Sequence, residues 1–125
     1  MSNVVLVDLT DGVMILTLNR PDKKNALNNE AYGALADAIE RAETDDAIRV
    51  VLLQSEGNVF CAGADIGDFA SANKGGAPRG PRNSTRLLAA LDRIEKPVIA
   101  AVQGAAVGIG TTMLMHVDLI CMAEE

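Results

Sequence analysis

Aromatic residues are scarce in this 125-residue sequence, which has no tryptophan, one tyrosine and two phenylalanines. Any core must therefore be built from aliphatic side chains, because apolar residues still make up 49% of the chain. Long apolar runs are also missing: no window approaches about 18 uncharged apolar residues, and the N-terminus does not resemble a signal peptide. We therefore expect one cytoplasmic domain over residues 1–125, with no membrane partner.

Cysteine and histidine are scarce too. Cys61 and Cys121 lie far apart, form no CxxC motif and each sit in an apolar run, which indicates small buried residues in a reduced setting rather than a disulfide. Cys61 as a nucleophile would lack a nearby base. His116, the only histidine, has no partner at metal-ligand spacing, so we expect no metal site.

Basic residues are outnumbered, 11 against 17 acidic residues, and the net charge is −6. Such a field repels phosphate backbones, so nucleic acid is not expected as a partner. Arg20, Lys23 and Lys24 nevertheless form a local cluster of cations. The cluster could hold an anionic small ligand, or it could be an ordinary solvated turn.

What is present is an alternation of β-rich and helical patterns. Asp11-Gly12 between two β-rich runs predicts a hairpin, and the short apolar run IRVVLLQ predicts a strand buried on both faces. We expect strands over Val4–Leu9, Val13–Leu18, Ile48–Gln54, Val98–Val102 and Val117–Met122, and helices over Asn28–Glu43, Asn83–Ile94 and from near Ile109 to His116, with Asn28 or Asn29 as the first cap. A mobile loop is expected at about 71–82. The order predicts an α/β fold with parallel pairing and right-handed crossovers.

Glycines mark the turn after the strand Val98–Val102. Gly104, Gly108 and Gly110 precede an expected helix whose first N–H groups lack partners within the helix. Such groups can bind a phosphate or an oxyanion, although the glycines could equally serve only close packing. Neither a dinucleotide fingerprint nor a P-loop fits, because Met113 stands where the fingerprint needs a glycine and no lysine follows.

A second turn of small residues, in NVFCAGADIGDF, follows the strand Ile48–Gln54. If the two turns converge, a carbonyl oxygen between the N–H groups of Ala64 and Ile109 would be polarised from two directions, as the stabilisation of an enolate requires. Asp65 in this turn could be catalytic, or it could cap the next segment.

Three segments resemble the enoyl-CoA hydratase/isomerase family, the crotonase superfamily: NRPDKKNALN over Asn19–Asn28, FCAGADI over Phe60–Ile66 and KPVIAAVQGAAVGIG over Lys96–Gly110. They occur in the family's order at similar spacing. The resemblance implies a crotonase-like spiral of ββα units. Because family members are roughly twice as long, it also implies that the chain is the N-terminal part of a single domain.

The resemblance further implies an acyl-CoA thioester as ligand, trimers or hexamers as the assembly, and no separate cofactor, because coenzyme A is part of the substrate. Its oxyanion hole would be the backbone N–H groups of Ala64 and Ile109. The residues that it implies around the coenzyme and substrate are Lys24, Asn25, Ala26, Ala62, Gly63, Asp65, Ile66 and Gly108.

One departure bears on the reaction. Thr112 stands where hydratases of this family carry a glutamate, so AVGIGTTMLMH looks closer to the Δ3,Δ2-enoyl-CoA isomerase branch, in which one downstream carboxylate moves the proton. We therefore expect double-bond isomerisation with a base beyond residue 125, since one base suffices for a 1,3-proton shift. An enoyl-CoA hydratase stays open as an alternative, and so does a non-catalytic chain that binds acyl-CoA or pairs with another chain through an exposed edge.

Overall fold

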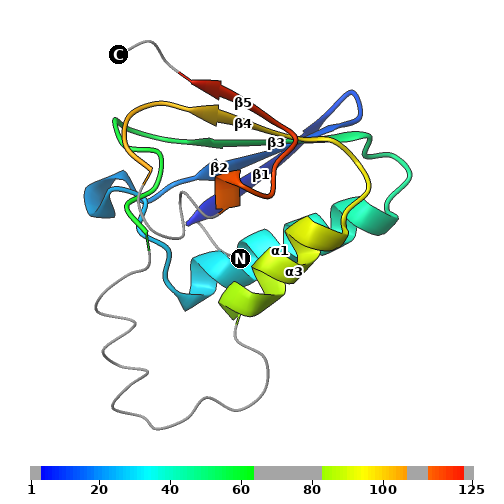
Figure 1. Cartoon of the computed structure of the whole chain (residues 1–125), viewed down its shortest axis with the longest axis horizontal. Coiled ribbons are helices and arrows are strands. Elements are labelled where there is room, and N and C mark those ends of the chain that lie inside the picture. The colour runs from blue at the N-terminus through cyan, green and yellow to red at the C-terminus, as the bar shows by residue number, and fades with distance from the viewer. Residues whose placement is uncertain (1–3, 64–82, 107–112, 123–125) are drawn as a thin grey trace, which may run out of the picture.

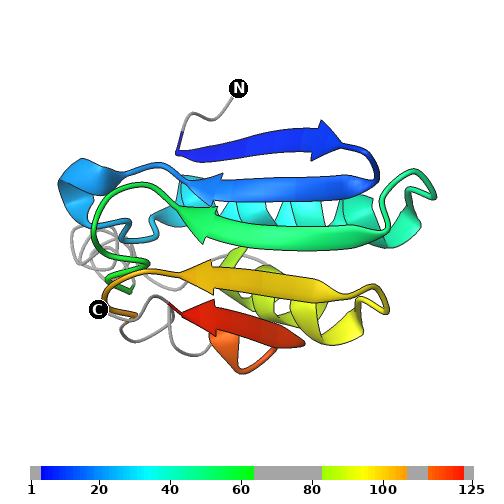
Figure 2. The same ribbon diagram turned by 90° about the horizontal axis from the view of Figure 1, so that it is seen from above.

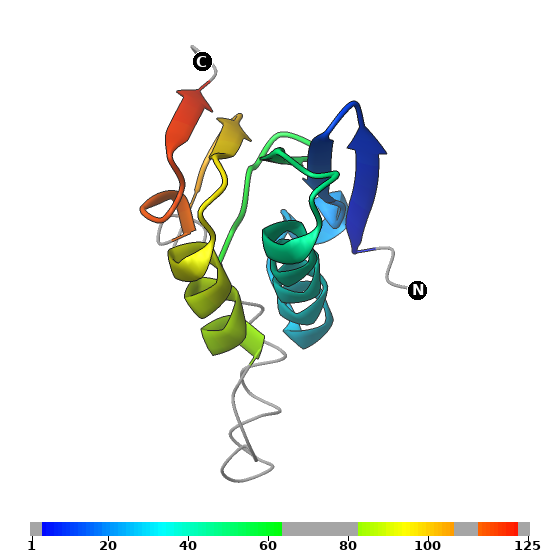
Figure 3. The same cartoon turned by 90° about the vertical axis from the view of Figure 1, so that its right-hand side faces the viewer.

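The structure, a computed structural model, describes residues 4–63, 83–106 and 113–122. These residues form one five-stranded sheet, in the order β1-β2-β3-β4-β5, with two long helices on one of its faces (Figure 1 and Figure 3). The strands are β1 (Val5–Thr10), β2 (Val13–Leu18), β3 (Val50–Ser55), β4 (Val98–Val102) and β5 (Leu119–Met122), and the helices are η1 (Pro21–Lys23), α1 (Asn29–Thr44) and α3 (Asn83–Arg93). The predicted α/β class is confirmed. The loop expected at about 71–82 lies outside the described residues.

The hairpin forms where Asp11-Gly12 predicts it. β1 and β2 pair antiparallel from Val5 opposite Leu18 to Thr10 opposite Val13. Asp11 and Gly12 have φ angles of 51° and 84°, the left-handed conformation that a two-residue hairpin turn requires and that Asp and Gly adopt most readily. The remaining neighbours, β2 with β3, β3 with β4 and β4 with β5, are parallel.

Helix α1 begins at a side-chain cap. The Asn28 side-chain oxygen accepts a hydrogen bond from the N–H of Ala31 at 2.9 Å, so Asn28, and not Asn29, is the cap residue. The buried side chains of α1 recur at the spacing of a single helix face, and they are Ala31, Tyr32, Leu35, Ala36, Ala38, Ile39 and Ala42. Four of these seven are alanines, which let the helix approach its neighbours closely.

The core lies between the helices and the sheet, which Figure 2 shows from the sheet side. Alternate residues of β2 and β3 point into it, and Met14, Leu16 and Val51 are fully buried. From α3, Leu87 and Leu91 pack into the same cluster. Each fully buried aliphatic side chain contributes roughly 1.5–3 kcal/mol to stability, so the aliphatic residues replace the missing aromatics.

One expectation about β3 is wrong. The run IRVVLLQ predicts a strand buried on both faces over Ile48–Gln54. The strand begins at Val50, and within it only Val51 and Leu53 are buried, whereas Val50, Leu52 and Gln54 are half-buried. The reason is that, in the part of the chain described, both long helices cover the same face of the sheet (Figure 3). The four residues of β5, at the sheet edge, are all exposed.

Candidate functional site

Three loops that carry the sequence motifs leave the same edge of the sheet. They are the β2 loop (residues 19–27), the β3 loop (residues 56–63) and the β4 loop (residues 103–106). Because β2, β3 and β4 are parallel, their carboxyl ends meet at one edge, which lies on the left of Figure 2. Ligands of α/β proteins commonly bind at this end of the strands. The fold therefore brings the three motifs together.

The β2 loop is held by a buried amide. Asn25 is 1% exposed, and its side-chain oxygen accepts from the N–H of Arg20 at 2.8 Å. Its NH₂ group donates to the carbonyls of Glu56 at 2.7 Å and Val59 at 2.8 Å. Lys24 and Asn25 both have positive φ, 53° and 58°, which asparagine tolerates better than most residues. The Asn25 side chain thus fastens the β2 loop to the β3 loop.

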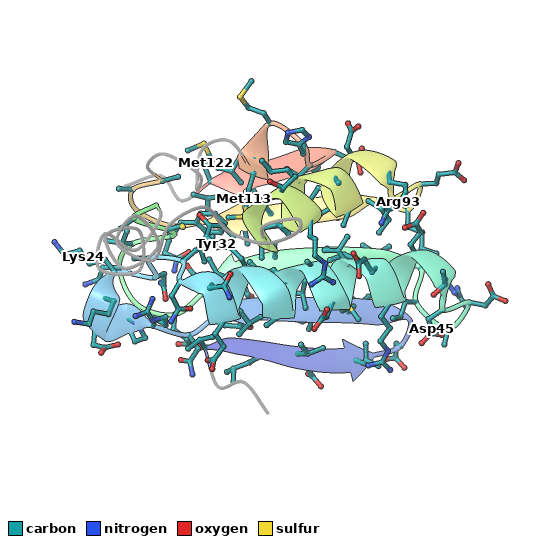
Figure 4. All side chains as sticks on the ribbon, turned by 90° about the horizontal axis from the view of Figure 1, so that it is seen from below. Lys24, Tyr32, Asp45, Arg93, Met113 and Met122 are labelled. Atoms are coloured by element: carbon teal, nitrogen blue, oxygen red, sulfur yellow. The ribbon has the colours of Figure 1, made fainter. Side chains whose placement is uncertain are left out.

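Backbone hydrogen bonds join the same two loops further along. The N–H of Ala62 donates to the carbonyl of Lys24 at 3.0 Å, and the N–H of Leu27 donates to the carbonyl of Gly63 at 2.7 Å. The side chains of Lys23 and Lys24 are exposed beside this junction, and Figure 4 shows Lys24 at the opposite end of the molecule from Asp45. The predicted coenzyme-binding residues of the two loops, Lys24 to Ala26 with Ala62 and Gly63, are therefore brought together.

The β4 loop lies directly against the β3 loop. The N–H groups of Phe60 and Cys61 both donate to the carbonyl of Ala105, at 3.0 Å and 3.2 Å. Cys61 and Ala106 form a parallel β-bridge. Gly104, with φ of +73°, comes so close to the β3 loop that an added Cβ would overlap the carbonyl oxygen of Asn58. Glycine is therefore required at Gly104 both for its backbone conformation and for space.

The predicted oxyanion donors Ala64 and Ile109 lie outside the described residues, as do Asp65, Ile66 and Gly108. The structure does describe the chain up to Gly63 before Ala64, and up to Ala106 before Ile109. Ala64 follows Cys61 by three residues, and Ile109 follows Ala106 by three residues. The β3 and β4 loops therefore run parallel at the bridge between Cys61 and Ala106. Each bridge residue lies three positions before one of the two predicted donors.

Cys61 is fully buried at this bridge. Burial raises the pKa of its thiol above the ordinary value, and a hydrogen bond with the backbone of Gly63 opposes this only in part. A raised pKa keeps the sulfur protonated, which is the opposite of what a nucleophile needs. Cys61 therefore serves the packing beneath the bridge, together with the fully buried Phe60.

Residues 4–63, 83–106 and 113–122 contain neither a cluster of metal ligands nor a helix that could span a membrane. No group of three or more His, Cys, Asp or Glu side chains there could hold a metal ion. No helix in those ranges has both the length and the apolar character needed to cross a bilayer. His116 lies in a helical turn, where its N–H donates to the carbonyl of Met113 at 3.0 Å.

Sequence reasoning missed Gln103 and the close approach of Gly104 to Asn58. The Gln103 NH₂ group donates to the Ser55 carbonyl at 2.8 Å, the Ser55 hydroxyl at 3.1 Å and the Gly57 carbonyl at 3.0 Å. A lone amide at the end of an apolar strand was the available signal, since such a side chain needs partners when it is partly buried.

Known proteins resemble this chain over nearly all of its length. The family model described as enoyl-CoA hydratase/isomerase matches residues 8–125. The chain belongs to the enoyl-CoA hydratase/isomerase family. Members of this family with solved structures include an enoyl-CoA hydratase/isomerase from Pseudoalteromonas atlantica T6c, which is 43% identical with a TM-score of 0.87 over 96% of this chain and 46% of that one. The crotonase fold is thereby shown.

Two curated relatives in Escherichia coli K12 differ in the reactions their names state. The 1,2-epoxyphenylacetyl-CoA isomerase is 39% identical over 100% of this chain and 49% of its own. The 2,3-dehydroadipyl-CoA hydratase is 36% identical over 97% of this chain and 47% of its own. The chain spans about half the length of the curated relatives that it matches. The names include isomerase and hydratase, so similarity alone does not choose between the two reactions.

Proposed function

We propose that this chain binds the thioester of an acyl-CoA and stabilises its enolate between the backbone N–H groups of Ala64 and Ile109. The observation that carries the proposal is the parallel bridge between Cys61 and Ala106. It supports a common target for the two loops, because two N–H groups can share one oxygen only if their segments arrive side by side.

Coenzyme binding would use the junction of the β2 and β3 loops. The exposed ammonium groups of Lys23 and Lys24 suit the phosphates of coenzyme A, although the chain carries a net charge of −6. No separate cofactor is part of the proposal, because the thioester itself makes the C2 proton acidic. We also propose a cytoplasmic location, because Cys61 and Cys121 are both free thiols, and assembly as a trimer or hexamer, from family membership.

For the reaction, we favour isomerisation of the double bond of an enoyl-CoA. A base removes the proton from C2 or C4, the charge moves to the thioester oxygen, and the same base returns the proton at the other carbon. Thr112, where hydratases carry a glutamate, supports one base rather than two. The remaining carboxylate would lie beyond residue 125. The hydratase alternative is kept because a 36% identical relative carries that name.

The test supplies the base from solution. The chain is incubated in D₂O with acetyl-CoA and increasing acetate, and deuterium at C2 is followed by NMR. Acetate removes the C2 proton, the oxyanion hole holds the charge, and deuterated acetic acid returns a deuteron. We expect exchange to rise with acetate, about tenfold or more above the same buffer without protein. No acceleration, or no binding of acetyl-CoA by calorimetry, would overturn the proposal.

The choice of reaction is tested separately. With a 3-enoyl-CoA and acetate, the conjugated 2-enoyl-CoA should appear, whereas a 2-enoyl-CoA in the same mixture should be hydrated more slowly. If hydration is much the faster reaction, the inference from Thr112 is wrong while enolate stabilisation stands.

A further inference from the structure

The start of the β3 loop lacks the packing that fixes most of the chain. Glu56, Gly57 and Asn58 are all exposed, and Ser55 before them is only half-buried. Apolar burial therefore contributes little to the position of this segment, and hydrogen bonds have to fix it. Further along, the buried Phe60 anchors the loop in the core.

On the β2 side these hydrogen bonds come from Asn25, which donates to the Glu56 and Val59 carbonyls, and from the Glu56 N–H, which donates to the Leu18 carbonyl. On the β4 side they come from Gln103, the first residue of the β4 loop. Its NH₂ group has three acceptors, and all three belong to Ser55 or Gly57. The β3 loop is thus tied to the β4 loop at two levels: by Gln103 where it begins, and by the Ala105 carbonyl, which accepts from Phe60 and Cys61, where it reaches the bridge.

We propose that Gln103 is a positioning residue, whose side chain sets the spacing of the β3 and β4 loops and hence the aim of the Ala64 and Ile109 N–H groups. This inference rests on the proposed function. Gln103 does not touch the thioester in this scheme, because its NH₂ group is occupied by Ser55 and Gly57. It acts on chemistry because an oxyanion donor works only within about 2.7–3.1 Å of the oxygen.

The alternative is that Gln103 only stabilises the fold. Gln54 offers a matched control, because it is also a partly buried glutamine at the carboxyl end of a strand, and its NH₂ group donates to the Thr17 hydroxyl at 3.1 Å. That hydrogen bond joins β3 to β2 within the sheet, one residue before Ser55, and involves neither Gln103 nor its acceptors. Gln54→Leu therefore removes a side-chain hydrogen bond without touching the two loops.

The experiment measures the polarisation of the bound carbonyl. Acyl-CoA labelled with ¹³C at the thioester carbon is bound to the unaltered chain, Gln103→Leu, Gln103→Glu and Gln54→Leu, and the shift of the C=O stretching frequency is read by isotope-edited infrared spectroscopy. Gln103→Glu keeps the size of the side chain but cannot donate when ionised. Affinity is measured by calorimetry and the Tm by thermal unfolding.

We expect both Gln103 variants to lose about half or more of the carbonyl shift, with affinity for the acyl-CoA changed less than about threefold, because the coenzyme contributes most of the binding. Gln54→Leu should keep the full carbonyl shift even if its Tm falls as much as that of the Gln103 variants.

If a folded Gln103 variant keeps the full carbonyl shift, or if Gln54→Leu loses as much of it as the Gln103 variants do, the positioning role is wrong while the proposed function stands. Failure of both Gln103 variants to fold, with Gln54→Leu folded, would also overturn it, since Gln103 would then be required for the fold itself. No carbonyl shift in the unaltered chain overturns the proposed function and this inference together.

Discussion

At the scale of single residues, the three loops at the carboxyl ends of β2, β3 and β4 are held together at positions where only one residue type fits. Asn25 satisfies three backbone groups from a fully buried position, and leaving such groups without partners costs about 1–3 kcal/mol each. Gly104 has positive φ and meets the carbonyl of Asn58. Neither residue has to touch a ligand to matter, because each fixes one loop against another.

Gly104→Ala should destabilise the chain severely, because the new methyl group would overlap backbone that cannot move independently. Gly57→Ala is the control: its φ of +87° is similarly left-handed, but the new Cβ would meet only Pro21, its Cβ at 3.1 Å and its Cα at 3.8 Å. We expect Gly57→Ala to cost about 1–2 kcal/mol and Gly104→Ala clearly more, measured by urea unfolding. Equal losses would mean that backbone conformation, and not the contact with Asn58, makes glycine necessary at Gly104.

At the scale of elements, the sequence predicts local features well. The Asp11-Gly12 hairpin and an asparagine cap at Asn28 or Asn29 depend on residues within a few positions of one another. The hairpin is confirmed, and of the two asparagines the cap is Asn28. The bridge between Cys61 and Ala106, by contrast, joins residues 45 positions apart. Its register depends on how far each strand runs before its loop, which no local pattern encodes. The open face of β3 was mispredicted for a related reason, since a continuous apolar run does not reveal which face the helices cover.

Helices α1 and α3 are also joined across their surfaces by charge. The Arg86 guanidinium lies 2.8 Å from both the Asp37 and the Glu40 carboxylates, and these hydrogen bonds, that with Asp37 first, raise its pKa above the ordinary value. Arg41 instead pairs with Asp45, the residue directly after α1, at 3.6 Å.

Arg86→Gln should therefore lower the Tm more than Arg41→Gln, because Arg86 links two helices and the Arg41–Asp45 pair does not. The difference should shrink in 1 M salt, where the Debye length falls to about 3 Å. Thermal unfolding at low and high salt measures both effects. A difference that persists unchanged in high salt would assign the role of Arg86 to its packing rather than to its charge.

At the scale of the whole molecule, Cys61 reports on opening of the core. Its folded-state pKa is raised by burial, so below the ordinary thiol pKa both states keep the proton and stability is unaffected. As pH rises through about 8.5, the unfolded chain loses a proton that the folded chain retains, and the unfolding free energy falls by up to about 1.4 kcal/mol per pH unit.

Cys61→Ala should remove this fall in the unfolding free energy at high pH, whereas Cys121→Ala should retain it, since Cys121 is exposed. Urea unfolding at pH 8 and pH 10 checks this, and an identical pH dependence in both variants would contradict it.

The central claim concerns two backbone amides, so the most direct test observes them. In a ¹⁵N-labelled chain titrated with acetyl-CoA, the amide protons of Ala64 and Ile109 should both move downfield with one shared Kd, because both donate to the same thioester oxygen. Free coenzyme A, which lacks the thioester, should shift the β2 loop resonances but leave these two in place. If either amide stays unmoved by acetyl-CoA, or if coenzyme A alone moves both equally, the two loops do not form an oxyanion hole.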